Sequence, residues 1–529
     1  MEYDIIFILG EKFFDHPLCG IAILKRLLEK NGYKVAVIET PEKADDLTKF
    51  GKPKLFFGVS SGAIDSMVRN YTALKRPREK DELLEYQKKI PDRAVIVYCN
   101  WIKEKFKDSK IVIGGTEATL RRFSHYDYWN NSLRKSIIFD SRADILVYGA
   151  GEKQILEIAD KIKNNQSLFG ILGTCIKSSE IPKNFVLLPS HEQLIENKES
   201  FCDVRKLGKE EFSEHSKISK GEYKFCDMQN LLSNNENLAQ KTGNFYILQY
   251  KSPKYTSKDL DEYYELDFSR KINETMKGFE FSVITHRGCI GNCNFCSLKL
   301  TMGDKIISRS EDSIIRELIK FTKMPGFKGI VDDLGGPSAN MYGMDCSLCT
   351  KECLSCPKLD RSNKRLINLL KKLREIPGIK KIFVRSGIRY DLATEEYLKD
   401  LVKYHISGKL KIAPEHINKN VLKLMNKDEG NLDEFIKKFK SLNPNGELAF
   451  YFMTGHPGCG MKEAKELAEK IKTLKNAESV QIFTPIPMSV STCMYYTELN
   501  PKTKKHIYVA KTFKEQKDQK RILNLRKTS

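Results

Sequence analysis

The sequence predicts an α/β protein in which a doubly wound amino-terminal domain is followed by a partial parallel barrel of six strand and helix units. Two observations carry this prediction. Apolar strand-like runs alternate with helix-period segments over the first 165 residues, and a second, longer alternation begins at Phe281. The length of 529 residues also exceeds that of one ordinary domain. We therefore expect a doubly wound domain over 1–165, a linking and capping region over 166–275, a partial barrel over 276–490 and a basic tail over 491–529.

The amino-terminal domain is predicted from apolar runs that are separated by helical segments. The expected strands are Tyr3–Leu9, Tyr33–Ile38, Leu55–Ser60, Ile111–Gly114 and Ile145–Tyr148. The expected helices are Ile21–Lys30, Ala94–Phe106 and Glu152–Lys163. The periodicity weakens after about Asn165, and for that reason a linking region is expected there.

The partial barrel is predicted from a regular series of strands and helices. The expected strands are Phe281–Thr285, Gly329–Asp332, Ile382–Arg385, Leu410–Ala413, Glu447–Met453 and Ser479–Phe483. The expected helices are Asp312–Lys323, Lys364–Glu375, Glu395–Tyr404, Leu432–Phe439 and Lys462–Leu474. A cysteine-rich insertion at 341–360 interrupts the series. Such barrels place their chemistry in the loops at the carboxyl ends of the strands.

The composition is that of a globular protein, with 40% hydrophobic and 30% charged residues. No apolar run reaches the roughly 18 residues that a membrane span needs. The chain begins with an acidic flank and a short apolar run, unlike a signal peptide. We therefore expect a cytoplasmic protein without a membrane partner.

The formal net charge of +21 favours phosphate-rich partners, so nucleic acid is one candidate partner. The excess is spread thinly and is densest between Pro501 and Ser529. No aromatic platform accompanies it, which favours a solvated tail over an RNA-binding arm.

The 14 cysteines are unevenly distributed, and seven of them fall into two groups between Cys289 and Cys356. A cytoplasmic chain does not need disulfides, so the grouped cysteines indicate metal sites. The scattered ones are interpreted as small buried hydrophobic residues.

The first group, Cys289, Cys293 and Cys296, has the spacing CxxxCxxC in a loop that follows a buried strand. With no fourth ligand nearby, the three fit zinc poorly. Three thiolates also leave one iron of a [4Fe–4S] cluster with open positions, which the amino and carboxylate groups of a methionine can occupy. Electron transfer into the sulfonium of S-adenosylmethionine would then release a 5′-deoxyadenosyl radical.

This triplet, with Phe295 before its last cysteine, resembles the signature of the radical S-adenosylmethionine superfamily. Several further phrases resemble the YgiQ-type proteins of that superfamily over nearly the whole chain. They are Phe14–Pro17, Gly114–Ala118, Arg121–Phe123, Gly335–Tyr342, Val384–Asp391, Ala413–His416, His456–Gly458 and Phe483–Met488.

The resemblance implies a set of residues that contact S-adenosylmethionine. Phe295 would pack near the adenine, and Gly335-Gly336 would form the turn that receives the methionine amino group. Polar residues after the third and fourth strands would contact the ribose and carboxylate. These are Arg385, Ser386, Arg389 and Glu415. Each of the four has a structural role as its alternative, and Arg385 is favoured because a guanidinium pairs bidentately with a carboxylate.

The second group, Cys346, Cys349, Cys353 and Cys356, forms a CxxCxxxCxxC run. Four thiolates this close predict a second metal site, and spacing alone leaves zinc and a second iron–sulfur cluster open. The site would serve electron relay, substrate binding or the structure of the insertion.

In related radical enzymes the doubly wound domain often binds cobalamin through a histidine in an Asp-x-His-x-x-Gly turn. Asp15 and His16 are adjacent in this chain and Gly20 lies four residues further, so the spacing departs from that pattern and argues against cobalamin. His16 and His286 are candidates for proton transfer or substrate binding.

The leading hypothesis is a radical S-adenosylmethionine enzyme that acts on an unknown substrate and uses a reductant such as flavodoxin or ferredoxin. Modification of RNA, protein or a small molecule is an analogy within that hypothesis. The alternative is a non-catalytic, metal-stabilised nucleic-acid-binding protein. The catalytic residues that act on the substrate stay unassigned.

Overall fold

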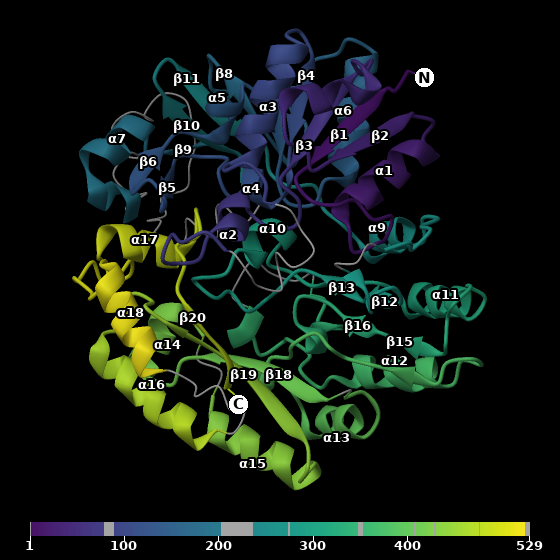
Figure 1. The fold of residues 1–529 in the computed structure, drawn as a ribbon, viewed down its shortest axis with the longest axis vertical. Coiled ribbons are helices and arrows are strands. Elements are labelled where there is room, and N and C mark those ends of the chain that lie inside the picture. The colour runs from purple at the N-terminus through teal and green to yellow at the C-terminus, as the bar shows by residue number, and fades with distance from the viewer. Residues whose placement is uncertain are drawn as a thin grey trace.

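The computed structural model describes residues 2–78, 89–202, 236–272, 276–346, 353–406, 408–427, 430–474 and 477–523. The amino-terminal sheet and the barrel strands occupy the two halves of the molecule, with the short helices α4 (Gly115–Thr119) and α10 (Leu298–Met302) between them (Figure 1). None of the helices in these ranges is both long and apolar enough to span a membrane.

The amino-terminal half is built on one nine-stranded sheet. In spatial order its strands are β2 (Val35–Glu39), β1 (Ile5–Leu9), β3 (Phe56–Ser60), β4 (Lys110–Ile113), β7 (Ile145–Val147), β8 (Thr174–Ser178), β11 (Phe245–Gln249), β10 (Leu238–Thr242) and β9 (Val186–Leu188). The first five run parallel, as predicted, and β8 then pairs antiparallel with β7.

Helices cover both faces of this sheet. All five residues of β1 are buried, because alternate side chains point to opposite faces. Ile5 and Phe7 pack on the face that α1 (Gly20–Lys30) and α6 (Glu152–Lys163) cover. Ile6 and Ile8 pack on the face of α3 (Ala94–Lys105). The arrangement is the doubly wound one that the alternating pattern predicts.

The sheet continues past residue 165, where the weakening periodicity placed a boundary. Four strands between Thr174 and Gln249 extend it, so this part of the expected linking region belongs to the same sheet. These strands are three to five residues long, and three of them carry polar residues, as in the Thr-Cys-Ile-Lys-Ser of β8. Short strands, several of mixed polarity, give a weak sequence signal.

The remaining elements of this half are short and join the larger ones. They are 44–50 (a 3₁₀ helix), α2 (Ser66–Asn70), β5 (His125–Asp127), β6 (Ser132–Arg134), α5 (Ile137–Ser141), α7 (His191–Glu196), 198–202 (a 3₁₀ helix) and α9 (Ser257–Tyr264).

The carboxyl-terminal half contains the six strand positions of the predicted barrel. They are β12 (Ser282–Ile284), β15 with β16 (Ile330–Val331, Asp333–Gly335), β17 (Lys381–Ile382), β18 (Lys409–Glu415), β19 (Glu447–Thr454) and β20 (Ala477–Ile482). Parallel pairing links β12 to β16, β15 to β17, β18 to β19, and β19 to β20. A parallel bridge between Ile388 and Ile412 joins the third position to the fourth.

Amphipathic helices cover the outside of this barrel and close a single large apolar core. They are α11 (Glu311–Thr322), α12 (Lys364–Arg374), α13 (Glu395–Tyr404), α15 (Leu432–Leu442) and α16 (Met461–Thr473).

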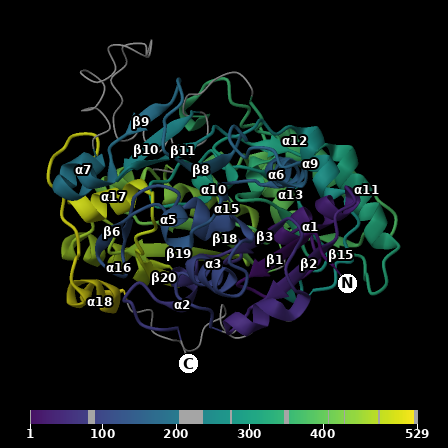
Figure 2. The same ribbon diagram turned by 90° about the horizontal axis from the view of Figure 1, so that it is seen from above.

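The last segment, expected as a basic tail from residue 491, is packed as far as Leu523. It forms α17 (Val490–Thr497) and α18 (Phe513–Ile522), which lie on the side of the molecule away from α11 in both views (Figure 1 and Figure 2). Gln519 of α18 is 1% exposed and accepts hydrogen bonds from Thr454 Oγ1 (2.8 Å) and the Gly455 amide (3.0 Å). The basic composition hid this packing, because the buried contacts of α18 are amides rather than apolar side chains.

Candidate functional site

The three predicted cluster cysteines lie in a loop that begins just after β12. The loop runs between the two strands of a short hairpin, β13 (His286–Arg287) and β14 (Ile307–Ser308), and contains α10. Gly288 opens it with φ +87°, and a Cβ there would lie 1.8 Å from the Lys305 carbonyl oxygen. Only glycine fits this approach of two chain segments.

The sulfur atoms of Cys289 and Cys293 converge on the backbone of Gly291. A Cβ on Gly291 would lie 3.3 Å from Cys289 Sγ and 3.7 Å from Cys293 Sγ. Burial raises the pKa of the Cys296 thiol to about 12, and the nearby Cys293 adds to that rise. The three cysteines therefore share one site, and each of them is partly exposed.

The residues present fit a [4Fe–4S] cluster. Each of the three thiolates would bind one iron of such a cluster, and the triplet would leave the fourth iron without a ligand of its own.

Buried cations surround the cysteine loop. Arg389 and Lys299 are each 6% exposed and Lys427 is 9% exposed. Arg389 Nη1 donates to Cys293 Sγ at 3.9 Å, Lys299 Nζ donates to Asn292 Oδ1 at 2.7 Å, and the charge of Lys427 acts to lower the pKa of Cys296. Arg389 is also paired with Asp391, with 2.9 Å between Nη2 and Oδ2. Three positively charged side chains thus lie next to the cysteine loop.

The segment after the fourth barrel strand holds the loop in place. The Asn294 amide donates to the Met425 carbonyl, and its side chain donates to the Leu424 carbonyl, both at 2.8 Å. Asn426 Nδ2 donates to the Asn292 carbonyl, also at 2.8 Å. Leu424 and Met425 belong to α14 (Lys419–Met425). These contacts fix the backbone on both sides of the second cysteine, Cys293.

Phe295, predicted to pack near the adenine, is half-buried beside the ring of His456, with 6.4 Å between the ring centroids. His456 Nε2 lies 2.7 Å from Ser491 Oγ, and its Nδ1 lies 2.8 Å from the Pro457 carbonyl oxygen. Burial lowers the pKa of His456 to about 3, so the imidazole is neutral and acts as a fixed support for Phe295. The contact of Phe295 with adenine stays a prediction.

Neighbouring side chains occupy the positions that a Cβ on either glycine of the predicted turn would take. Gly335 ends β16, and a Cβ there would lie 2.6 Å from Ser386 Oγ. A Cβ on Gly336 would lie 2.5 Å from the ring of His286. The Gly335 carbonyl accepts the amide of Thr285 at 2.8 Å, which ties this turn to the strand that leads into the cysteine loop.

The polar residues predicted to contact the cofactor have different surroundings. Arg385 Nη1 donates to the Gly278 carbonyl at 2.8 Å, so its guanidinium reaches the segment before β12 and not the cysteine loop that follows it. Ser386 Oγ donates to Asp333 Oδ2 at 2.6 Å, beside Gly335. Arg389 reaches a cluster cysteine, since its Nη1 donates to Cys293 Sγ at 3.9 Å.

Glu415 is the last residue of β18 and adopts a left-handed backbone with φ +64°. A register irregularity in the pairing of β18 with β19 precedes it. Such a conformation is uncommon for residues other than glycine and turns the chain sharply at the carboxyl end of the strand. The position matches the expected one, and its contact with a cofactor stays a prediction.

The second cysteine group lies next to the first. Cys289 packs against the same apolar cluster as Cys353 and Cys356. That cluster consists of Ile290, Ile306, Met341, Met344, Leu359 and Leu392. Cys346 is half-buried at the start of the insertion, and Cys349 falls outside the described residues. The sequence predicted the second cysteine group but not its contact with the apolar cluster that Cys289 also contacts.

The amino-terminal sheet meets the cysteine loop directly. Leu300 of α10 is fully buried and belongs to the apolar core of the doubly wound domain. Arg287 forms a 2.7 Å ion pair with Glu152, which begins α6. The loop that carries the cysteines is therefore held by both halves of the protein.

His16, a candidate in the first-strand loop, is fully buried and bonded through both ring nitrogens. Its Nδ1 accepts the Leu18 amide at 3.0 Å, and its Nε2 lies 2.9 Å from the Glu280 carbonyl oxygen. Burial lowers the pKa of His16 to about 3. The residue connects the amino-terminal loop to the start of the barrel.

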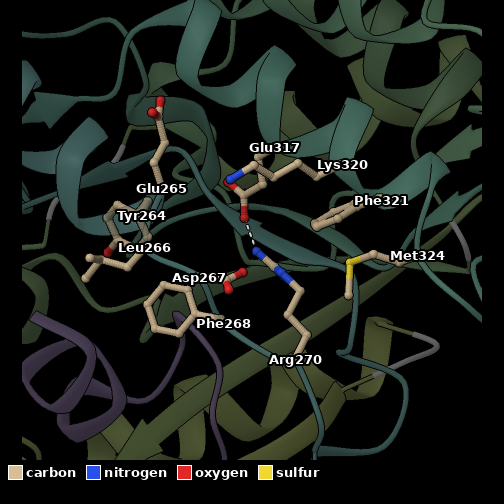
Figure 3. Close-up of a pocket in the computed structure, with 10 residues that line it drawn as sticks. All are labelled: Tyr264, Glu265, Leu266, Asp267, Phe268, Arg270, Glu317, Lys320, Phe321 and Met324. Carbon is tan, nitrogen blue, oxygen red and sulfur yellow. Dashed lines mark hydrogen bonds and ion pairs between the residues drawn. The ribbon is translucent and has the colours of Figure 1, made fainter. Parts of the chain in front are cut away.

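A separate pocket of about 210 Å³ is lined by α11 and the segment after α9 (Figure 3). Arg270 points at Glu317 in its wall, and Glu317 also pairs with Arg309. The lining includes none of the cysteines. This pocket is a feature of the packing between linker and barrel and not of the cysteine site.

Sequence reasoning missed the residues that support the loop, namely Lys299, Lys427, Asn426, His456 and Leu300. None of them belongs to a metal-binding spacing. The only signal for His456 was its place in the His456–Gly458 phrase.

Comparison with known proteins agrees with this geometry. A family model described as radical SAM N-terminal matches residues 1–284, and the model of the radical SAM superfamily matches residues 283–471. The fold and the cysteine loop thus define a radical S-adenosylmethionine (SAM) protein, which belongs to a class of enzymes. The matches do not specify the reaction.

Within that class the chain belongs to the UPF0313 family of YgiQ-type proteins. It is 40% identical to the UPF0313 protein of Methanocaldococcus jannaschii over 98% of this chain and 89% of that relative. It is 39% identical to the UPF0313 protein of Fusobacterium nucleatum over 98% of this chain and 95% of that relative. The predicted family is confirmed.

Solved structures confirm the predicted fold class. The radical S-adenosylmethionine methyltransferase TsrM from Kitasatospora setae, solved with cobalamin and a [4Fe–4S] cluster, has a TM-score of 0.53 at 15% identity and covers 92% of this chain and 74% of that chain. The cobalamin-dependent radical enzyme OxsB has a TM-score of 0.51 at 10% identity, covering 96% and 57%. None of these comparisons points to a nucleic-acid-binding protein.

Proposed function

We propose that Cys289, Cys293 and Cys296 hold a [4Fe–4S] cluster at which S-adenosylmethionine is cleaved reductively, so that a 5′-deoxyadenosyl radical acts on a substrate not yet known. The observation that carries this proposal is the loop itself. Three cysteines share one site just after the first barrel strand, and buried cations surround them. The cluster supplies the electron that breaks the carbon–sulfur bond of the sulfonium.

The residues of the chain bind and orient the cofactor. The Gly335-Gly336 turn is proposed to receive the methionine amino group, because glycine allows close approach of the backbone to a ligand. Phe295, supported by His456, forms an apolar wall for the adenine. Ser386 and Glu415, which follow the third strand position and end the fourth, are proposed to contact the ribose and carboxylate.

Anaerobic reconstitution with iron and sulfide, followed by dithionite and S-adenosylmethionine, tests this function. We expect 5′-deoxyadenosine and methionine in equal amounts, and neither when dithionite is omitted. Liquid chromatography with mass spectrometry measures both products. A protein that loads iron but forms neither product would contradict the proposal.

The second cysteine group is proposed to hold another iron–sulfur cluster, because Cys353 and Cys356 pack against the same apolar wall as Cys289. That position suits a relay of electrons from a reductant such as flavodoxin or ferredoxin to the first cluster. A zinc ion is redox-inactive and could not relay electrons.

Replacing Cys353 and Cys356 together by Ser is expected to lower iron from about eight to about four atoms per chain, as removal of one four-iron cluster requires. Metal analysis by inductively coupled plasma mass spectrometry measures the change. Loss of zinc with unchanged iron would instead identify a structural zinc site. Unchanged content of both metals would mean that these cysteines bind none.

Cobalamin, present in the TsrM and OxsB structures, fits this chain poorly. His16 has both ring nitrogens engaged, so neither is available as a lower ligand. Leu300 of the cysteine loop fills space in the core of the doubly wound domain. We therefore propose no step that involves cobalamin.

A further inference from the structure

Arg389 is the charged side chain that the fold brings against a cluster cysteine. Its Nη1 lies 3.9 Å from Cys293 Sγ and would lie 2.9 Å from a Cβ on Gly291. The guanidinium therefore covers the turn on which the sulfurs of Cys289 and Cys293 converge. No alternative to glycine at position 291 leaves room for this contact.

Two hydrogen bonds with Asn340 fix the backbone of Arg389. Its amide donates to Asn340 Oδ1 at 3.0 Å, and Asn340 Nδ2 donates back to the Arg389 carbonyl at 2.8 Å. Asn340 is fully buried and follows the Gly335-Gly336 turn. The position of the guanidinium is thus determined by the barrel rather than by a flexible surface loop.

The carboxylate of Asp391 pairs with the other edge of the guanidinium. Arg389 Nε donates to Asp391 Oδ1 at 3.1 Å, and Nη2 donates to Asp391 Oδ2 at 2.9 Å. This bidentate pair uses the edge with which Arg389 could have bound the carboxylate of S-adenosylmethionine. The contact that remains toward the cluster comes from Nη1. The role predicted for Arg389 from the sequence, a direct cofactor contact, is therefore not the one that this geometry favours.

We propose that the Arg389–Asp391 pair sets the reduction potential of the cluster on Cys289, Cys293 and Cys296. This inference rests on the proposed function, because it requires that cluster to be present. Reduction adds one negative charge to the cluster, and a buried cation that donates a hydrogen bond to a ligand sulfur stabilises the reduced form. Arg389 raises the potential for this reason, and the carboxylate of Asp391 limits the rise.

Two substitutions separate these opposing effects. Arg389→Gln removes the positive charge and is expected to lower the potential, making reduction at least tenfold less favourable, or about 59 mV for a one-electron couple. Asp391→Asn removes the negative charge and is expected to raise the potential. The potential is measured without S-adenosylmethionine by a redox titration monitored by electron paramagnetic resonance, in protein that also carries Cys353→Ser and Cys356→Ser.

The matched control is the pair of Arg374 and Asp400, which is also bidentate, with both contacts at 3.0 Å. It joins α12 to α13 on the outside of the barrel. Arg374→Gln and Asp400→Asn are expected to leave the potential unchanged. Where Arg389→Gln loads no iron, Asp391→Asn carries the test, because it changes the charge from the other side of the pair. Arg389→Lys keeps the charge, so its equilibrium constant for cluster reduction is expected to stay within threefold of that of the unsubstituted protein, or about 28 mV.

The inference is overturned if Arg389→Gln and Asp391→Asn shift the potential in the same direction, or if neither shifts it more than the control pair does. Such a result would leave the proposed function intact, since the cluster would still be loaded and S-adenosylmethionine still cleaved. Failure of the proposed function is seen differently, as iron-loaded unsubstituted protein that forms no 5′-deoxyadenosine.

Discussion

Cys293→Ala is expected to abolish cleavage of S-adenosylmethionine, with 5′-deoxyadenosine falling roughly 100-fold or more, because a lost ligand costs more than a lost supporting contact. Two thiolates cannot hold three irons of the cluster. The Arg389 guanidinium would also lose the sulfur that it contacts at 3.9 Å. Iron content and product formation after anaerobic reconstitution measure the effect.

Cys175→Ala is the matched control. Cys175 lies in strand β8 of the amino-terminal sheet, is fully buried and packs in the core of that half. Its removal leaves a small cavity far along the chain from the loop, and iron loading is expected to stay at the level of the unsubstituted protein. Full cleavage of S-adenosylmethionine by Cys293→Ala, or equal losses of iron and product in both variants, would contradict the assignment of Cys293 as a cluster ligand.

Glu317→Ala is expected to lower the free energy of unfolding by about 3–5 kcal/mol, since it leaves buried cations without their counter-charge. The carboxylate pairs with both Arg270 and Arg309, and the exposed fractions of the three side chains are 7% or less. Arg270 also donates to the carbonyls of Glu280 and Ser282, which begin the first barrel strand. Urea denaturation followed by circular dichroism measures the loss.

The comparison variant for this prediction is Glu265→Ala. Glu265 lines the same pocket but pairs with Arg316, whose side chain is 54% exposed. Solvent screens such a pair, so its loss is expected to cost less than about 1 kcal/mol. Equal destabilisation by the two substitutions would show that burial does not determine how much the Arg270–Glu317–Arg309 network contributes to the free energy of unfolding.

Periodicity located the main strands and helices of both halves because their apolar faces are regular. The fully apolar β1 and the amphipathic α6 and α12 lie within two residues of their predicted bounds. Periodicity failed where burial is achieved by polar groups. Strands β8 and β10 mix polar and apolar residues over short lengths, and α18 buries Gln516 and Gln519 instead of a continuous apolar stripe.

The site was predictable to the extent that its chemistry is local in sequence. The cysteine spacing located the loop, and the Gly335-Gly336 pair located the turn beside it. The partners of these elements come from distant segments, such as Asn426 for the backbone of Asn292 and Asn340 for Arg389. The sequence favoured Arg385 among the polar candidates, and only the fold shows that Arg385 reaches Gly278 while Arg389 reaches Cys293.

The most direct test of the central claim is the electron paramagnetic resonance spectrum of the reduced protein before and after addition of S-adenosylmethionine. The Cys353→Ser, Cys356→Ser protein is used, so that only the cluster on Cys289, Cys293 and Cys296 contributes. Binding of the cofactor to the iron without a protein thiolate predicts a changed spectrum. An unchanged spectrum at saturating S-adenosylmethionine, in protein with about four irons per chain, would contradict the claim.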